Sequence, residues 1–298
     1  MPRAVILGEP SSGSTTFVAL LYSTLVRTAV EREDEFRFAV APESVDLLTG
    51  MYAQLMSGEL PGTPRPEEIA TMRLTLAFSR RNRGRSWLGK STDYSGVPKV
   101  ECRWVQARFE QIEASLRGGD TSADPTASLI ECTIPIFLLP VTGFGPDVSS
   151  SNSTGQSLDH SVMSVLHGLA RPFEVARRPS GEALHPIVVF TQLDGCSPEA
   201  LGRFGLKSPL DDNELEQQHR RLSSAFLEEF IPKTAEYCGS AGSAVGAPEV
   251  FFSFLQTETG EGGEARVKVW TAADHSRQPV YARNQFQALI SYLGALAL

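Results

Sequence analysis

Two glycines and a run of hydroxyl-bearing residues lie close together near the start of the chain, in the segment Gly8–Thr16 with sequence GEPSSGSTT. Their spacing matches, at all positions but one, the phosphate-loop pattern G-x-x-x-x-G-K-[ST]. In that pattern, backbone N–H groups at a helix N-terminus hold phosphates and the final hydroxyl ligates Mg²⁺. Thr15 occupies the position of that hydroxyl, and Ser14 stands where the pattern has lysine. Because an apolar run precedes the segment and a helical pattern follows it, we predict a phosphate-binding loop; an ordinary strand–helix turn is the alternative.

A second segment, Gly84–Ser91, matches the same pattern at every position, with Lys90 as its lysine. Arginines rather than an apolar strand precede it, and no helical pattern follows it. Without a helix N-terminus such a loop lacks the field and the N–H donors that bind phosphate. We therefore interpret this match as a coincidence.

Two further segments carry carboxylates at positions that suit a nucleotide site. Asp93–Gly96 is a D-x-x-G, in which the aspartate would hold Mg²⁺ through water and the glycine N–H would face the γ-phosphate. Thr191–Asp194 is close to [NT]-K-x-D, in which the aspartate accepts hydrogen bonds from guanine N1–H and the 2-amino group. Asp194 follows an apolar strand, at the edge where α/β sheets bind ligands. A surface turn at Asp93 and a helix N-cap at Asp194 are the alternatives.

The apolar residues fall into two alternating kinds of segment. Short unbroken runs suit strands buried on both faces, and longer segments with apolar residues three and four apart suit helices. This alternation predicts an α/β fold, a mostly parallel central sheet of about six strands with helices on both faces. The runs assigned to strands are Ala4–Leu7, Phe36–Val40, Met72–Phe78, Ile134–Leu139, Ile187–Phe190 and Val250–Leu255.

The segments between these strands predict the rest of the organisation. We expect an extra helical insertion, Val45–Leu55, before the third strand, and a helix over Val105–Leu116. A Ser-, Gly- and Asn-rich stretch predicts a flexible insertion around residues 146–157. With no repeat and no linker, residues 1–298 are expected to form a single domain.

The composition of the 298-residue chain excludes several classes of protein. With 41% hydrophobic and 21% charged residues it differs from disordered, collagen-like and disulfide-scaffold chains. A net charge of −8 argues against nucleic acid as a partner. Four cysteines without a C-x-x-C pair, no signal peptide and no apolar stretch of membrane-spanning length lead us to expect a cytoplasmic protein. Only five of the 27 basic residues are lysines, and none lies in Gly8–Thr16.

Five segments, in order along the chain, resemble the successive motifs of a translation-factor-class (TRAFAC) P-loop GTPase. The resemblance is greatest to the double-GTPase group of bacterial conflict, or defence, systems. It implies a Ras-like P-loop fold, GTP or GDP with Mg²⁺ as cofactors, and protein partners from the same operon, such as a second GTPase. It also implies that Thr63 is the switch threonine and that Ser253 belongs to the last base-contacting loop. The segments are Gly8–Thr16, Gly58–Pro64, Asp93–Gly96, Thr191–Asp194 and Phe252–Ser253.

Three positions depart from the pattern of that family. Ser14 replaces the phosphate-loop lysine, Val97 stands where these GTPases carry a water-orienting residue, and Gln192 replaces the lysine of [NT]-K-x-D. Losing a charge-assisted contact of about 1.5–3 kcal/mol lowers affinity about tenfold to a hundredfold, and hydrolysis is expected to fall further. We therefore expect a guanine-nucleotide-binding regulatory or scaffold subunit with weak or absent hydrolysis.

Two alternatives stay open. In a working GTPase, an arginine from residues 80–85 or from a partner would compensate for Ser14. In the other, the chain is an interaction module without nucleotide. The expected metal ligands are Thr15 and Asp93, and the expected catalytic positions are Thr63 and Gly96. The residues expected to contact nucleotide are Gly8, Ser12, Gly13, Ser14, Thr15, Thr16, Thr191, Asp194 and Ser253.

Overall fold

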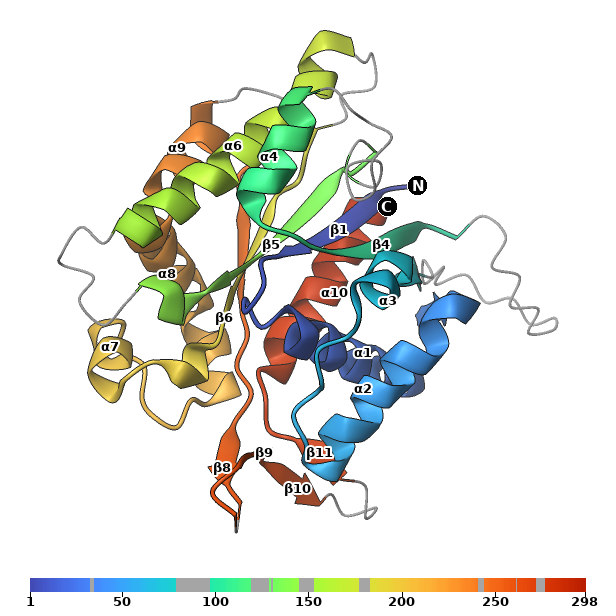
Figure 1. Cartoon of the computed structure of the whole chain (residues 1–298), viewed down its shortest axis with the longest axis vertical. Coiled ribbons are helices and arrows are strands. Elements are labelled where there is room, and N and C mark those ends of the chain that lie inside the picture. The colour runs from blue at the N-terminus through green and yellow to red at the C-terminus, as the bar shows by residue number, and fades with distance from the viewer. Residues whose placement is uncertain are drawn as a thin grey trace, which may run out of the picture.

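A computed structural model shows how these segments are arranged (Figure 1). Several of the predicted positions, Asp93, Gly96 and Lys90 among them, lie outside the residues that the structure describes. The described residues are 1–32, 35–78, 97–118, 129, 131–144, 153–176, 183–240, 244–260, 262–271 and 277–298.

A seven-stranded sheet forms the centre of the fold, in the order β2-β3-β4-β1-β5-β6-β7. The strands from β4 through β7 are parallel, whereas β3 is antiparallel to both β4 and β2. This confirms the predicted mostly parallel α/β sheet, and the arrangement is that of a Ras-like P-loop fold. The strand bounds are β1 Arg3–Gly8, β2 Phe36–Val40, β3 Arg73–Phe78, β4 Lys99–Gln106, β5 Ile134–Pro140, β6 Ile187–Thr191 and β7 Glu249–Phe252.

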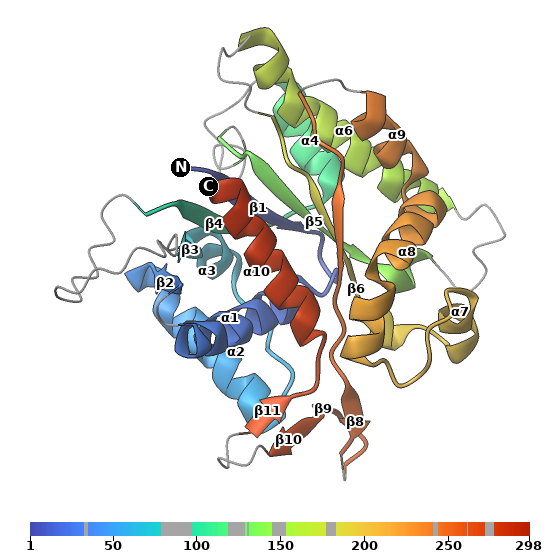
Figure 2. The same cartoon turned by 180° about the vertical axis from the view of Figure 1, so that it is seen from behind.

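Helices cover both faces of the sheet, and the two faces form separate cores (Figures 1 and 2). Alternate residues of β1 enter opposite cores, Ile6 toward α1 and Leu7 toward α4 and α6, as the two-residue period of a strand requires. One face carries α1 Ser14–Glu31, α2 Val45–Ser57, α3 Pro66–Thr71 and α10 Arg283–Ala297. The other carries α4 Phe109–Gly118, α6 Ser153–Ala176, α7 Pro198–Arg203, α8 Asp212–Phe230 and α9 Pro232–Ser240.

Short elements complete the described chain. Two small antiparallel hairpins lie between β7 and α10 (Figure 1). In the part of the chain that the structure describes, no helix has the length and apolar character needed to cross a membrane. The short elements are η1 Pro42–Ser44, η2 Val141–Phe144, η3 Leu193–Gly195, β8 Thr257–Thr259, β9 Ala265–Val267, β10 Val269–Thr271 and β11 Arg277–Pro279.

One strand was assigned wrongly from the sequence. Val105 was expected on a helix, but it lies in β4, and α4 begins only at Phe109. In β4 the buried side chains alternate, with Val100, Cys102 and Trp104 facing the core that contains α1. Polar residues between them break up the apolar run, so the period of two is hard to see. The sheet therefore has one strand more than expected.

One of the two predicted insertions is present as a helix, and the other lies partly outside the described residues. The extra helix before the third strand is present as α2, and α3 follows it. The predicted insertion at 146–157 overlaps α6, which begins at Ser153. Residues 145–152 lie outside the described part of the chain.

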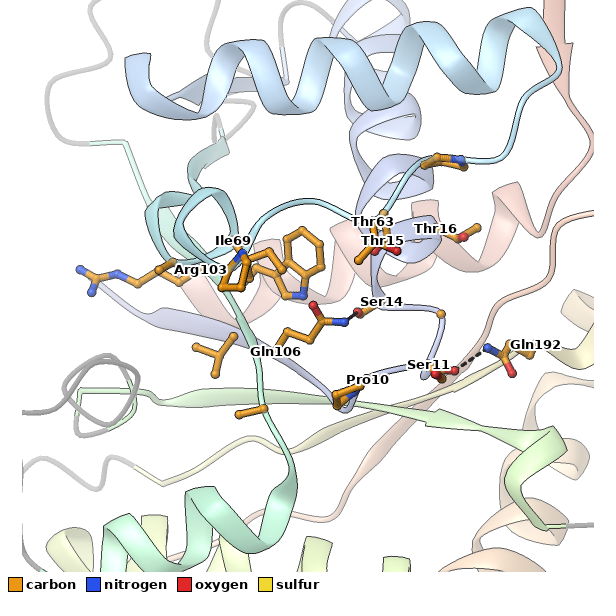
Figure 3. Close-up of a pocket in the computed structure, with 17 residues that line it drawn as sticks. Pro10, Ser11, Ser14, Thr15, Thr16, Thr63, Ile69, Arg103, Gln106 and Gln192 are labelled. Atoms are coloured by element: carbon orange, nitrogen blue, oxygen red, sulfur yellow. Dashed lines mark hydrogen bonds between the residues drawn. The ribbon is translucent and has the colours of Figure 1, made fainter.

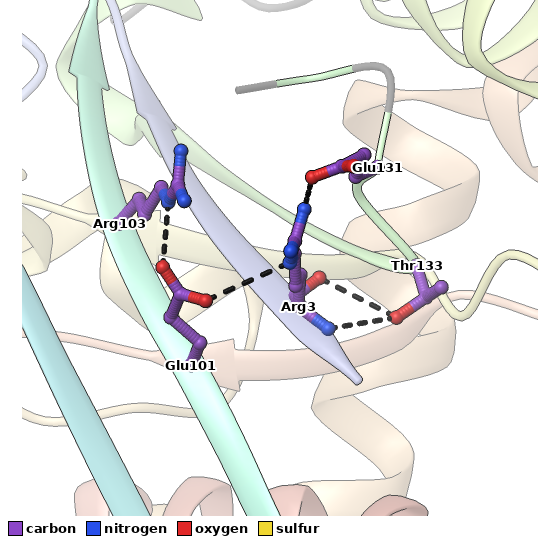
Figure 4. Close-up of polar contacts among 5 residues, drawn as sticks. All are labelled: Arg3, Glu101, Arg103, Glu131 and Thr133. Carbon is purple, nitrogen blue, oxygen red and sulfur yellow. Dashed lines mark hydrogen bonds and ion pairs between the residues drawn. The ribbon is translucent and has the colours of Figure 1, made fainter. Parts of the chain in front are cut away.

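Ion pairs join β1 to its neighbours at the end of the sheet where β1 begins (Figure 4). Arg3 is 3.6 Å from the carboxylate of Glu101 and also contacts Glu131. Glu101 pairs in turn with Arg103 at 2.8 Å. The N–H of Arg3 donates to the hydroxyl of Thr133 at 3.1 Å. The charge of Arg103 is therefore partly neutralised within its own strand.

Candidate functional site

The turn between β1 and α1 is a tight loop that only glycine can begin. A Cβ atom on Gly8 would lie 2.7 Å from Ser12 Oγ and 2.8 Å from Ser14 Cβ. The N–H of Ser12 donates to the carbonyl of Glu9 at 3.0 Å. Gly13 caps α1 with φ 75°, in the left-handed region that glycine adopts without strain. Each of the two glycines is therefore required where it stands, Gly8 because a Cβ atom would clash and Gly13 because of its left-handed backbone.

The loop leads directly into the N-terminus of α1. The first N–H groups of a helix have no acceptor within the helix, and they carry the positive end of its dipole. In α1 the first intrahelical bond from the loop is Phe17 N–H to Gly13 C=O, at 2.9 Å. No acidic residue lies in the first turn of α1 to satisfy these groups. This 18-residue helix thus offers backbone donors and a positive field to an anion.

A cleft of about 860 Å³ opens beside this helix end (Figure 3). The structure brings Thr63 to the same cleft from the segment between α2 and α3, although α1 and Thr63 are far apart in sequence. The carboxyl end of β4 forms another wall, and Ile69 of α3 another. Ser12 also belongs to the loop, but its side chain is buried. Its hydroxyl has no hydrogen-bond partner among the described residues. The predicted residues that line the cleft are Gly13, Ser14, Thr15, Thr16 and Thr63.

The segment after β6 holds the loop in place. The hydroxyl of Thr191 donates to the carbonyl of Ser12 at 2.6 Å. The amide of Gln192 donates to the carbonyl of Ser11 at 2.8 Å and accepts from the hydroxyl of Thr142 at 2.7 Å. Gln192 therefore connects the loop, through its amide nitrogen, to the segment just after β5, through its amide oxygen. Thr191, which was predicted to contact nucleotide, lines the smaller cavity beside the loop, and its hydroxyl positions the loop.

A smaller cavity of about 100 Å³ adjoins the cleft, and Gly13, Thr16 and Gln192 line both. Asp194 and Ser253, which the sequence predicted as base-contacting residues, lie together in this cavity. Leu255 N–H donates to the carboxylate of Asp194 at 3.3 Å. Although Asp194 reaches the surface, desolvation raises the pKa of its carboxyl above the ordinary value, and the bond from Leu255 opposes this shift.

The carboxyl end of β4 reveals a residue that the sequence did not single out. Gln106 is paired with Gly8 in the sheet, and its amide donates to the hydroxyl of Ser14 at 3.3 Å. The strand next to β1 therefore reaches the phosphate loop at Gln106. Val97 lies beyond Lys99, at the opposite end of β4. Gln106 could have been identified only from its pairing with Gly8, and that pairing is known only once the strands are placed in the sheet.

The donor set at this edge does not fit Mg²⁺ well. Mg²⁺ prefers an octahedral shell of oxygens that includes one or two carboxylates. Among the described residues lining the cleft, hydroxyls and amides are present, and Arg103 alone carries a charge. The nearby carboxylate of Glu9 accepts the N–H of Phe109 at 2.8 Å, at the start of α4. The described residues also contain no group of three His, Cys, Asp or Glu side chains that could hold a metal ion.

The similarity of this chain to known proteins is weak. No protein-family model matches the chain, and no curated protein matches it. Among solved structures, the chain is similar to the signal recognition particle receptor SRb-GDP-Mg from Chaetomium thermophilum. The identity is 13%, with 85% of this chain and 89% of that chain covered, and the TM-score is 0.30. The assignment of the fold therefore rests on the sheet order and on the loop between β1 and α1.

Proposed function

We propose that this protein binds a guanine nucleotide and acts as a GTPase-like regulatory or scaffold subunit with little or no hydrolysis. The observation that carries the proposal is the pair of adjoining cavities at the end of β1. One lies against the N-terminus of α1, the other contains Asp194, and Gly13 and Thr16 line both. A nucleotide has a matching division into phosphates and base.

Each cavity supplies the chemistry for one part of that ligand. The N–H groups at the start of α1 would hold the phosphates through the loop Gly8–Thr16. The Asp194 carboxylate would accept from guanine N1–H and the 2-amino group, a donor pair that adenine lacks. Its contact with Leu255 N–H orients the carboxylate for this task. Discrimination by such charge-assisted hydrogen bonds favours guanine over adenine nucleotides.

Among the described residues, no cation other than Arg103 lines the cleft where the transferred phosphoryl group would lie. Ser14 is neutral and buried, and its hydroxyl already contacts Gln106. Arg103 is paired with Glu101 and points away from the loop (Figure 3). Because phosphoryl transfer depends on charges placed around the transition state, we infer that a bound nucleotide is held and sensed rather than turned over.

We propose a cytoplasmic bacterial defence system as the setting, with a second GTPase from the same operon as partner. The support is the order of the five motif segments, which resembles that of the double-GTPase group. The reading frames next to this gene test the pairing. We expect one of them to encode a P-loop GTPase with an intact G-x-x-x-x-G-K-[ST], and neighbours without a phosphate loop would contradict a paired system.

Titration calorimetry with GTP, GDP and ATP tests the proposed function. We expect GDP and GTP to bind with one site per chain and ATP to bind about tenfold more weakly or worse. We also expect no release of phosphate from GTP above that of a buffer control. Turnover would instead support a working GTPase with a compensating arginine, and no binding of any nucleotide at millimolar concentration would support an interaction module.

The variant Ser14→Lys sharpens the same experiment. Restoring a charge beside the phosphates is expected to raise the affinity for GTP about tenfold to a hundredfold. Val45→Lys, at an exposed position on α2, adds the same charge away from the cleft and serves as the control. An unchanged affinity in a folded Ser14→Lys variant would mean that the phosphates do not lie at this loop.

A further inference from the structure

The neutral contact between Ser14 and Gln106 points to nucleotide binding that does not depend on a divalent cation; this inference rests on the proposed function. Two of the three strands at the centre of the sheet meet here, because Gly8 ends β1 and Gln106 ends β4. The Gln106 amide donates to Ser14 Oγ at 3.3 Å. The groups that meet where β4 reaches the loop are thus an amide and a hydroxyl, and both are uncharged.

Mg²⁺ bound to phosphates at such a loop is usually also held by the loop hydroxyl and by an aspartate from a nearby strand end. The strands beside β1 are β4 and β5. In the described chain β4 ends in Gln106, and Thr142, just after β5, donates its hydroxyl to Gln192. Neither position provides a carboxylate.

Two carboxylates near the loop, Glu9 within it and Asp194 in the adjoining cavity, already have partners. Glu9 accepts the N–H of Phe109 and thereby fixes the start of α4. Asp194 lies in the smaller cavity, where it accepts the N–H of Leu255. Moving either side chain toward the cleft would break a hydrogen bond to a backbone donor, which is costly for partly buried groups.

The electrostatics of the cleft lead to the same conclusion. The phosphates would meet N–H groups and a helix dipole, which act without a metal. A metal would find hydroxyls such as that of Thr15 but no negative charge from the protein among the described lining residues. The protein would therefore hold a nucleotide about equally well with and without Mg²⁺.

Binding of a fluorescent GDP analogue in Mg²⁺ and in EDTA tests this inference. In the natural protein we expect the two dissociation constants to agree within about twofold. In Gln106→Asp, a carboxylate that can only accept replaces the amide that donates to Ser14, and we expect binding in Mg²⁺ to be about tenfold tighter than in EDTA or better. Gln217→Asp, on an exposed part of α8, adds the same charge far from the loop and should leave the ratio unchanged.

A thermal melt of each variant checks that it folds, and Gln106→Glu provides a second carboxylate if Gln106→Asp does not. A natural protein that loses about tenfold or more of its affinity in EDTA would overturn the inference. The variant Asp93→Asn would then show whether Asp93 is the missing ligand. If no analogue binds in either buffer to any variant, the proposed function fails and this inference with it, so the two failures are distinguishable.

Discussion

At the scale of single residues, three neutral side chains set the character of the site. Ser14 and Gln192 stand where the two motifs have lysine, Gln106 is the residue of β4 paired with Gly8, and each makes a hydrogen bond to its surroundings. The three side chains therefore take part in the hydrogen bonds in and around the loop. A loop can keep its shape and its backbone donors while it loses its charges, because the shape depends on Gly8 and Gly13 and on contacts from β6.

The variant Asp194→Asn tests base recognition. An asparagine keeps the acceptor for Leu255 N–H but presents a donor to guanine, so affinity for GDP should fall about tenfold to a hundredfold. Affinity for ATP should stay the same, which calorimetry can compare directly. Asp46→Asn, at an exposed position on α2, makes the same change away from the cavity and should affect neither ligand. Equal losses for both nucleotides would point to a structural effect rather than to recognition.

At the scale of elements, two residues at the end of β6 hold the loop Gly8–Thr16 by hydrogen bonds to its carbonyls. Thr191→Val removes the hydroxyl that donates to the buried carbonyl of Ser12 and keeps the shape of the side chain. We expect a loss of about 1–3 kcal/mol in the free energy of unfolding, because the carbonyl is left without its partner. Urea denaturation measures this loss. Thr49→Val is the matched control, because the hydroxyl of Thr49 bonds only within α2, and it should lower the free energy of unfolding by less. Equal losses of free energy would mean that the hydrogen bond from Thr191 to Ser12 does not stabilise the loop specifically.

The starts of α8 and α10 meet at a carboxyl group. Asp212 accepts the N–H of Asn284, and desolvation raises the pKa of Asp212 to about 6, with the charge of Glu216 adding to the shift. A carboxyl with a raised pKa in the folded state favours folding while it is protonated, and this contribution is lost as the pH rises from about 4 to about 6.

The variant Asp212→Asn removes that titration and keeps an acceptor for Asn284. At pH 7 we expect the variant to be more stable than the natural protein by about 1 kcal/mol, after allowance for solvent screening of this partly exposed group. At pH 4 the two should have similar stability. Denaturation at a series of pH values measures the difference, and a difference that does not change with pH would contradict the raised pKa.

Strands buried on both faces leave a clear pattern in the sequence, whereas strands buried in an alternating pattern and contacts between distant residues do not. Ala4–Leu7 and Ile134–Leu139 could be predicted as strands because central strands are buried on both faces and their apolar runs are unbroken. β4 is buried in an alternating pattern, and its last residues continue into the spacing of α4, so Val105 was assigned to the wrong element. Gln106 could not be identified at all, because its role comes from pairing with Gly8, more than ninety residues away.

At the scale of the whole molecule, the C-terminal segment supports the helix that carries the phosphate loop. Phe286 of α10 packs on Phe17 of α1, with ring centroids 5.1 Å apart. The hydroxyls of Tyr281 and Thr24 lie 2.9 Å apart in the buried space between the same segments. Both chain ends lie close together in the two views (Figures 1 and 2). The last helix therefore belongs to the same core as α1, the helix that follows the loop.

The variant Gly294→Ala tests how tightly that last helix packs. A Cβ atom there would lie 2.8 Å from the ring of Phe78 in β3, so α10 or the ring must move. We expect the free energy of unfolding to fall by about 1–2 kcal/mol despite the better helix propensity of alanine. Gly50→Ala in α2 meets no atom within 4 Å and should instead stabilise the protein by about 1 kcal/mol. Thermal or urea denaturation measures both, and two stabilising substitutions would mean that α10 packs loosely.

The central claim is that the loop Gly8–Thr16 holds the phosphates of a guanine nucleotide. A crystal structure of the protein with GDP tests it most directly. We predict that the phosphates lie within hydrogen-bond distance of the N–H groups at the start of α1 and that the guanine edge faces Asp194 in the smaller cavity. GDP bound at another place, or an empty loop in crystals grown at saturating GDP, would contradict the account.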